Sequence, residues 1–138
     1  MPIHIIDDQS EVSFILSELL KDFSGQVQCF CSAEAYLEYW RSDGFIEPKL
    51  IITDVRMPGM DGFELIRQIR ASGSSAKAIV MSGYQFESNA CEQHICGYIN
   101  KPFNCEKVIS MVSEILDCNY SPLSSVHDAS LCWCCHKS

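Results

Sequence analysis

The amino-acid sequence predicts an α/β protein, a doubly wound parallel sheet with helices on both faces. Short apolar segments alternate with longer stretches of helical period over the first 118 residues, which is the rhythm of βαβ units. The segments at 49–53 and 76–81 read as continuous apolar runs, as expected of strands that are buried on both faces. A length of 138 residues suits a single compact domain.

The expected elements follow one another as five strand and helix pairs. Strands are predicted at 3–6, 26–30, 49–53, 76–81 and 97–100. Three helices have N-cap candidates, Ser32, Asp61 and Asn104, because side-chain oxygens at that position accept bonds from the first free N–H groups of a helix. The fourth helix, near 87–93, has a thin apolar stripe and is expected to be short or mobile.

Charge and hydropathy exclude several functions. Ten basic and eighteen acidic residues give a net charge of −8, which repels phosphate backbones and anionic membranes, so direct nucleic-acid or membrane binding is not expected. The longest apolar runs fall far short of the roughly 18 to 20 residues of a membrane span. The N-terminus has no basic segment before an apolar stretch, and a cytoplasmic location is therefore expected.

The C-terminal segment 119–138 reads as a Ser- and Cys-rich tail without an effector domain, following a domain at 1–118. The nine cysteines are odd in number and scattered, so most are expected to be buried reduced thiols rather than a disulfide framework. Cys29 and Cys31 share one face of the second strand and are expected to be buried. Metal binding by the tail is an alternative, with Cys132, Cys134, Cys135 and His136 as the candidate ligands. The close spacing of these four residues in the sequence disfavours a tetrahedral zinc site.

Polar residues follow four of the predicted strands: Asp7 with Asp8, then Asp54, Ser82 and Lys101. In a doubly wound sheet, the carboxyl ends of the strands form the functional edge. Three carboxylates there repel one another unless a cation neutralises them, and Mg²⁺ suits such hard oxygen ligands. The lysine and the hydroxyl could hold phosphate oxygens, which leaves Asp54 as the nucleophile. The commoner role for Asp7 and Asp8 alone is an N-cap cluster for the first helix.

Four motifs in this order give the chain, over about residues 2–118, a resemblance to the receiver (CheY-like) domain of two-component response regulators. They are the acidic pair Asp7-Asp8, Asp54 followed by Met57-Pro58-Gly59-Met60-Asp61-Gly62, Ser82-Gly83, and Lys101-Pro102-Phe103. The resemblance implies a flavodoxin-like sheet of strand order 2-1-3-4-5 and a receiver domain at 1–118.

The resemblance also implies a role for each site residue. Asp54 is expected to be the phosphoacceptor and to bind Mg²⁺ together with Asp7, Asp8 and the backbone carbonyl of Arg56. Ser82 is expected to sense the phosphoryl group and Lys101 to pair with it. Tyr98 matches the aromatic switch position, and the Lys101–Pro102 bond is expected to be cis.

The function implied is that of a switch that catalyses its own phosphorylation and dephosphorylation, not an enzyme with a separate substrate. The donor is expected to be a histidine kinase or a histidine phosphotransfer protein. A partner would dock on the surface formed by the fourth helix, fifth strand and fifth helix, where a homodimer could also form. A stand-alone regulator is expected, with an excised receiver as the alternative. The large residues Arg56 and Tyr84 suggest slow loss of the phosphoryl group, unless both simply lie in solvent.

Two competing functions use similar residues. A phosphatase of the haloacid-dehalogenase type needs a second acid two residues after the nucleophile, where this chain has Arg56. A pseudo-receiver that acts only as an interaction module would lack the phosphoacceptor or the lysine, and both are present.

Overall fold

The computed structural model describes residues 1–83 and 95–117 of the chain. All five strands belong to one parallel sheet of order β2-β1-β3-β4-β5, which confirms the predicted fold class and strand order. The strands are β1 (Ile3–Ile6), β2 (Val27–Phe30), β3 (Leu50–Asp54), β4 (Lys77–Ser82) and β5 (Gly97–Asn100). The three middle ones in the sequence begin one residue later than predicted.

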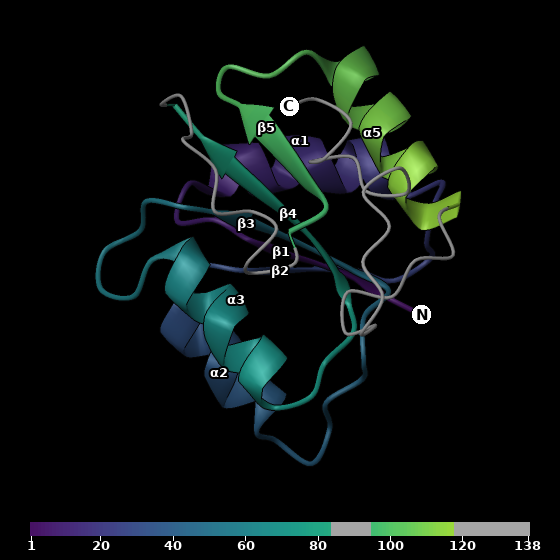
Figure 1. The fold of residues 1–138 in the computed structure, drawn as a ribbon. Helices are drawn as coiled ribbons and strands as arrows, with labels where there is room; N and C mark the ends of the chain where they lie inside the picture. Colours follow the sequence, from purple (N-terminus) through teal and green to yellow (C-terminus); the bar gives the residue numbers. More distant parts are fainter. Residues whose placement is uncertain (84–94, 118–138) are drawn as a thin grey trace.

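Helices cover both faces of the sheet (Figure 1). On one face lie α1 (Ser10–Leu20) and α5 (Cys105–Asp117), and on the other lie α2 (Ala33–Trp40) and α3 (Gly62–Ala71). The helix predicted near 87–93 and the tail 119–138 lie outside the described residues.

The alternation of side chains along each strand divides the core in two. In β1, Ile3 and Ile5 pack with the buried residues of α1 and α5, whereas Ile6 packs with those of α2 and α3. β3 divides in the same way, because successive side chains of a strand point to opposite faces. Burial on both faces explains why this strand reads as a continuous apolar run.

Side-chain caps begin three of the helices, as predicted. Ser32 accepts a hydrogen bond from the Ala35 N–H (3.0 Å), and Asp61 accepts one from the Glu64 N–H (2.8 Å). Asn104 accepts hydrogen bonds from the N–H groups of Glu106 (2.9 Å) and Lys107 (3.2 Å) at the start of α5. The N-cap position of α1 is held by Gln9, without a side-chain cap bond, so Asp7 and Asp8 are not its N-caps.

The prediction of buried thiols on the second strand is wrong. Cys29 and Cys31 are exposed, as is Cys105, whereas Cys96 is buried. The reason is topological: β2 is an edge strand, and α1 shields it only in part. The Cys29 thiol donates a weak hydrogen bond to the Ser13 carbonyl oxygen of α1 (3.8 Å). Cys31 lies beyond the end of β2 and is not part of the strand.

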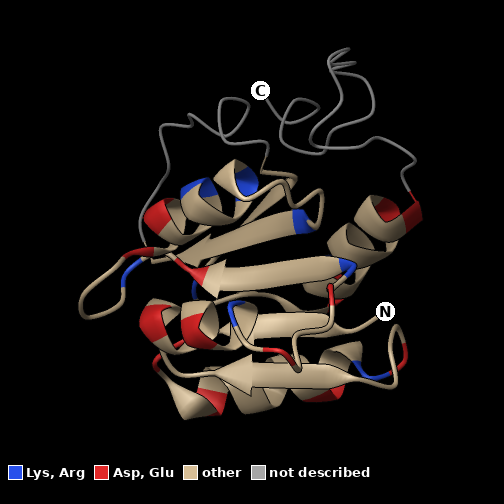
Figure 2. Ribbon diagram, turned by 90° about the horizontal axis from the view of Figure 1, so that it is seen from below, with Lys and Arg blue, Asp and Glu red and all other residues tan. Residues whose placement is uncertain are grey.

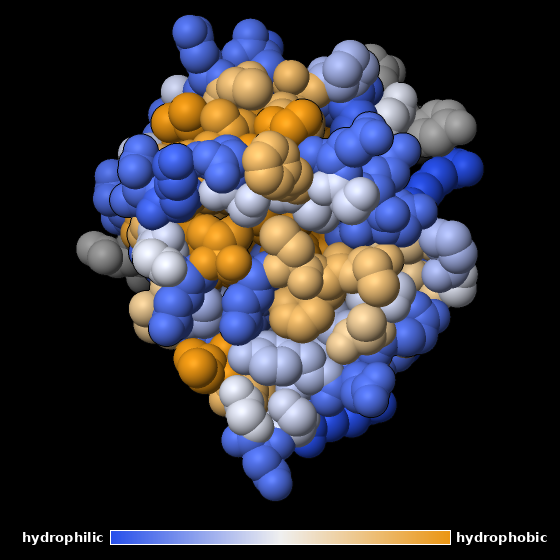
Figure 3. Space-filling model, turned by 180° about the vertical axis from the view of Figure 1, so that it is seen from behind, coloured by the Kyte–Doolittle hydropathy of each residue, from blue (hydrophilic) through white to orange (hydrophobic). Residues whose placement is uncertain are grey.

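Figure 3 shows the face of the molecule opposite to that seen in Figure 1, where apolar patches lie among hydrophilic side chains. The large apolar residues that are exposed in the described part of the chain include Phe14 and Ile15 of α1 and Ile109 of α5. Across 1–83 and 95–117, no helix has both the length and the apolar character to span a bilayer.

Candidate functional site

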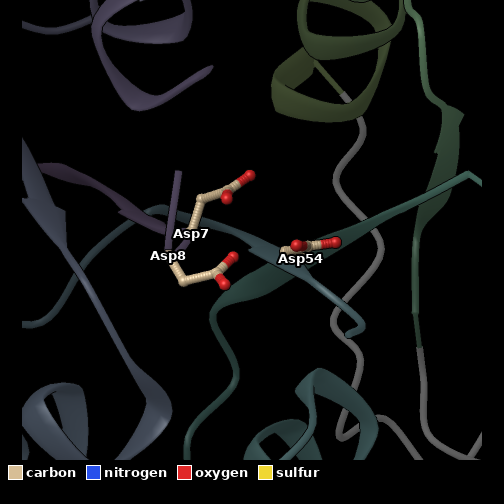
Figure 4. A group of neighbouring side chains, drawn as sticks. All are labelled: Asp7, Asp8 and Asp54. Atoms are coloured by element: carbon tan, nitrogen blue, oxygen red, sulfur yellow. The ribbon is translucent and has the colours of Figure 1, made fainter. Parts of the chain in front are cut away.

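Three carboxylates meet at the carboxyl ends of two neighbouring strands. Asp7 and Asp8 follow β1, and Asp54 is the last residue of β3. One carboxylate oxygen of each lies within 4.8 Å of those of the other two, and Figure 4 shows the three side chains next to one another. Asp7 and Asp54 are buried, whereas Asp8 is exposed. The predicted convergence of these residues is confirmed.

Lys101 adds a positive charge to this cluster from the end of β5, an edge strand of the sheet. It directly follows β5, which is separated from β3 by β4. Its Nζ lies 2.9 Å from Asp7 Oδ2 and 3.3 Å from Asp54 Oδ2. The other carboxylate oxygen of Asp7 accepts a hydrogen bond from the Gln9 N–H (2.8 Å). Both oxygens of Asp7 are thus held in place, so its carboxylate is ordered by the fold itself.

The electrostatics of the cluster follow from its burial and its excess of acid. Burial raises the pKa of Asp54, and so does the charge of Asp7, while Lys101 opposes the shift. Burial alone would lower the pKa of Lys101, but the hydrogen bond and the charge of Asp7 raise it above its usual value. Acidic segments also gather at the arrowhead ends of the strands, on the left of Figure 2. With three carboxylates and one ammonium group, the site has the charge and the hard oxygen donors that suit a divalent cation.

The segment after Asp54, residues 55–61, is referred to as the acceptor loop. The Gly62 N–H donates to the Val55 carbonyl oxygen (2.9 Å), which closes the loop. A Cβ atom on Gly62 would lie 2.3 Å from the Asp54 carbonyl oxygen, so only glycine allows α3 to begin this close to the acid site. Arg56 lies exposed within the loop.

Ser82 lies on β4, the neighbour of β3, and Tyr98 lies on β5, the next strand beyond it. Ser82 ends β4 and is buried, and its carbonyl oxygen accepts a hydrogen bond from the Lys101 N–H (2.8 Å). Tyr98 pairs with Val80 across β4 and β5, packs in the apolar group around Ile66 and Ile95, and has its hydroxyl shielded from solvent. The Lys101–Pro102 bond is cis, as expected. Tyr84 lies outside the described residues.

Sequence reasoning missed one residue beside the site. The carboxylate of Glu34, in the first turn of α2, accepts a hydrogen bond from the Met60 N–H of the acceptor loop (3.0 Å). No local pattern links two positions 26 residues apart, and a glutamate after an N-cap serine reads as an ordinary first-turn acid.

The fold and the site together define a doubly wound α/β protein with a lysine-bridged acidic centre at its strand ends. Comparison with known families identifies its class: residues 3–113 match the model of the response regulator receiver domain. The chain belongs to this family, whose members act as receivers in two-component signalling.

Curated relatives and solved structures agree with this membership. The chain is 34% identical over 115 residues to the transcriptional regulatory protein FixJ of Azorhizobium caulinodans, covering 81% of this chain and 53% of that protein. It is 40% identical over 73 residues to the transcriptional regulatory protein YesN of Bacillus subtilis, covering 51% of this chain and 20% of that protein. It thus spans about half or less of these relatives.

The fold also matches that of a solved chemotaxis response regulator, CheY4 of Vibrio cholerae. The TM-score is 0.70 at 20% identity, covering 81% of this chain and 95% of that one. At this level of identity the likeness concerns the fold.

Proposed function

We propose that Asp54 accepts a phosphoryl group from the phosphohistidine of a histidine kinase or a histidine phosphotransfer protein, in a Mg²⁺-dependent reaction. One observation carries the proposal: Lys101 contacts both Asp7 and Asp54 at the point where the three carboxylates meet. A nucleophile, a cation site and a fixed ammonium group are the parts that phosphoryl transfer to a carboxylate requires.

The metal would be held by the carboxylates of Asp7, Asp8 and Asp54 and by the backbone carbonyl of Arg56. Bound there, Mg²⁺ would neutralise negative charge on the transferring phosphoryl oxygens. The excess of carboxylate over ammonium charge in the cluster supports this assignment.

The transfer itself is assigned to Asp54 and Lys101. A carboxylate oxygen of Asp54 attacks phosphorus while the P–N bond of the phosphohistidine breaks, and the bonding electron pair stays on the imidazole nitrogen. The product is an acyl phosphate on Asp54. The Lys101 ammonium group already lies 3.3 Å from Asp54 Oδ2, so it can pair with a phosphoryl oxygen with little rearrangement.

The switch would be built from Ser82 and Tyr98. The Ser82 hydroxyl would donate a hydrogen bond to the acyl phosphate, and Tyr98 would pack further inward. This change would shift a two-state equilibrium of the surface around β5 and α5, to which the helix predicted near 87–93, outside the described residues, is expected to contribute. The backbone bond between Lys101 and Ser82 supports such coupling, because it joins the two phosphate-binding positions directly.

The output is proposed to be the docking of a partner protein on that surface, by a stand-alone regulator. FixJ and YesN, by contrast, are named transcriptional regulatory proteins, and this chain spans about half of the first and a fifth of the second. The mass of the native polypeptide, measured by immunoblot, decides between docking alone and an effector segment in the same chain.

The test of phosphorylation is intact-mass spectrometry of the reduced protein after incubation with acetyl phosphate and Mg²⁺. We expect one phosphoryl adduct on the wild type and none on Asp54→Asn. Asp43→Asn removes the same charge from an exposed loop and should be labelled like the wild type. EDTA should prevent labelling. If neither acetyl phosphate nor a phosphohistidine donor labels a folded wild-type protein, the chain is an interaction module that works without phosphorylation.

We further propose that Arg56 slows the loss of the phosphoryl group. The residue is exposed in the acceptor loop, from which a large side chain can hinder the approach of water. Arg56→Asn should shorten the half-life of the phosphorylated form, followed by intact mass after removal of the donor. An unchanged half-life would contradict this role.

A further inference from the structure

We propose that Glu34 is a positioning residue of the phosphorylation site, which holds the acceptor loop so that the Arg56 carbonyl and Asp54 can bind the cation together. The inference rests on the proposed function. It concerns a side chain on α2 that belongs to none of the four motifs of the site.

The contact between Glu34 and the acceptor loop is close and directional. Glu34 Oε2 accepts the hydrogen bond from the Met60 N–H (3.0 Å). A Cβ atom on Gly59 would lie only 2.4 Å from the same oxygen, and Gly59 has a positive φ of 84°. The carboxylate therefore lies against the bare backbone of Gly59, a position that any other residue would fill. Charge-assisted bonds of this kind are stronger than neutral ones, and the bond lowers the pKa of Glu34.

Hydrogen bonds within β3, the acceptor loop and α3 fix both ends of the loop, and Glu34 adds a further hydrogen bond from α2. At one end, Val55 is tied to Gly62 by a backbone hydrogen bond. At the other, Asp61 caps α3 through the Glu64 N–H. Arg56, Pro58 and Gly59 lie between these points. The bond from Glu34 to Met60 and the contact of Glu34 with Gly59 therefore restrain the second half of the loop, which follows Arg56.

A cation site is sensitive to such freedom. Mg²⁺ requires nearly ideal octahedral geometry, and groups that orient its ligands contribute to affinity without touching the metal. Glu34 is exposed and lies outside the core, and α2 has its own N-cap in Ser32. Loss of Glu34 should consequently affect cation binding much more than folding.

The test compares Glu34→Ala with Glu34→Gln and with a matched control, Glu38→Ala. Glu38 is exposed one turn further along α2, so its removal changes the charge equally. Isothermal titration with Mg²⁺ should show a Kd raised about tenfold in Glu34→Ala. Glu34→Gln, whose amide oxygen can still accept the Met60 bond, and Glu38→Ala should stay within about twofold of the wild type. Amide hydrogen exchange of the peptide covering 55–62 should accelerate in Glu34→Ala alone.

Labelling by acetyl phosphate provides the second readout. Glu34→Ala should be slowed at limiting Mg²⁺ and restored at saturating Mg²⁺, since the defect lies in cation binding. Gly59→Ala should impair Mg²⁺ binding as well, and its effect should not multiply with that of Glu34→Ala, because both disturb the same contact.

Two outcomes separate this inference from the proposed function. If the wild type binds Mg²⁺ and is labelled, but Glu34→Ala matches Glu38→Ala in Kd and in amide exchange, Glu34 has no positioning role. If the wild type neither binds Mg²⁺ nor accepts a phosphoryl group, the proposed function fails, and the role of Glu34 in that function fails with it. The amide exchange measurement still shows in that case whether Glu34 holds the acceptor loop.

Discussion

At the scale of single residues, the acid site keeps like charges together that would separate in water. Asp7 is only 2% and Asp54 only 6% exposed, and the charge of Asp7 raises the pKa of Asp54. Lys101 is the ammonium group that touches both. Its removal leaves two poorly solvated carboxylates without compensation, which is a larger cost than the loss of a surface ion pair.

Lys101→Ala should therefore destabilise the metal-free protein at pH 7.5 by roughly 2 kcal/mol, a figure below that of a fully buried pair because the lysine is partly exposed. Urea unfolding in EDTA, followed by circular dichroism, measures the effect. Lys107→Ala removes an exposed charge from α5 and should change the free energy of unfolding by less than about 0.5 kcal/mol. Equal effects of the two substitutions would show that Lys101 does not compensate the acid cluster.

At the scale of elements, the junction of β3 and α3 determines how close a helix can come to Asp54. The Gly62 backbone lies against the Asp54 carbonyl, and a Cβ there would also lie 3.1 Å from the Asp54 carbonyl carbon. Both obstructing atoms belong to the backbone, which cannot rotate away as a side chain can. Any larger residue must therefore displace either the start of α3 or the end of β3.

Gly62→Ala should lower the free energy of unfolding by about 2–3 kcal/mol and should also slow labelling of Asp54, because the displaced atoms belong to this proposed phosphoacceptor. Gly44→Ala is the matched control: no atom lies within 4 Å of its Cβ position. That substitution should be neutral or stabilising by about 0.5 kcal/mol. Chemical denaturation and intact-mass labelling measure the two effects, and a Gly62→Ala protein as stable as Gly44→Ala would refute the close approach.

At the scale of the whole molecule, the half of the core beneath α2 contains a buried histidine. His4 Nδ1 lies 2.7 Å from the Tyr36 hydroxyl, and the rings of Phe30, Tyr36, Tyr39 and Phe45 surround it at centroid distances of 5.4 to 6.2 Å. Burial lowers the pKa of His4 to about 4, against a weaker opposing effect of Gln28. The folded protein thus holds this imidazole neutral, while the unfolded chain protonates it near pH 6.5.

Global stability should consequently depend on pH through His4. The unfolded state binds the extra proton, so the contribution is fully present above pH 6.5 and is lost as the pH falls toward 4. Between pH 7 and pH 5 the loss should be about 2 kcal/mol. His4→Gln keeps a polar partner for Tyr36 and should flatten the dependence, as measured by urea unfolding at several pH values. An unchanged slope would mean that other groups cause the acid sensitivity.

Much of the fold and of the site could be predicted because the signals are local. The alternation in β1 assigns its side chains to two faces, and Ser32 and Asp61 mark helix starts within one turn of the chain. The convergence of Asp7, Asp54 and Lys101 follows from a topological rule, since parallel strands end at the same edge of the sheet.

Three other features of the molecule depend on contacts between distant segments. The exposure of Cys29 follows from the edge position of β2, and the bond from Glu34 to the acceptor loop joins α2 to a loop that no local pattern places beside it. That the Lys101 ammonium group bridges Asp7 and Asp54 could likewise be established only from the interatomic distances in the folded protein. Periodicity and caps report on neighbours within a turn or a strand, whereas these three features depend on which elements the completed core brings into contact.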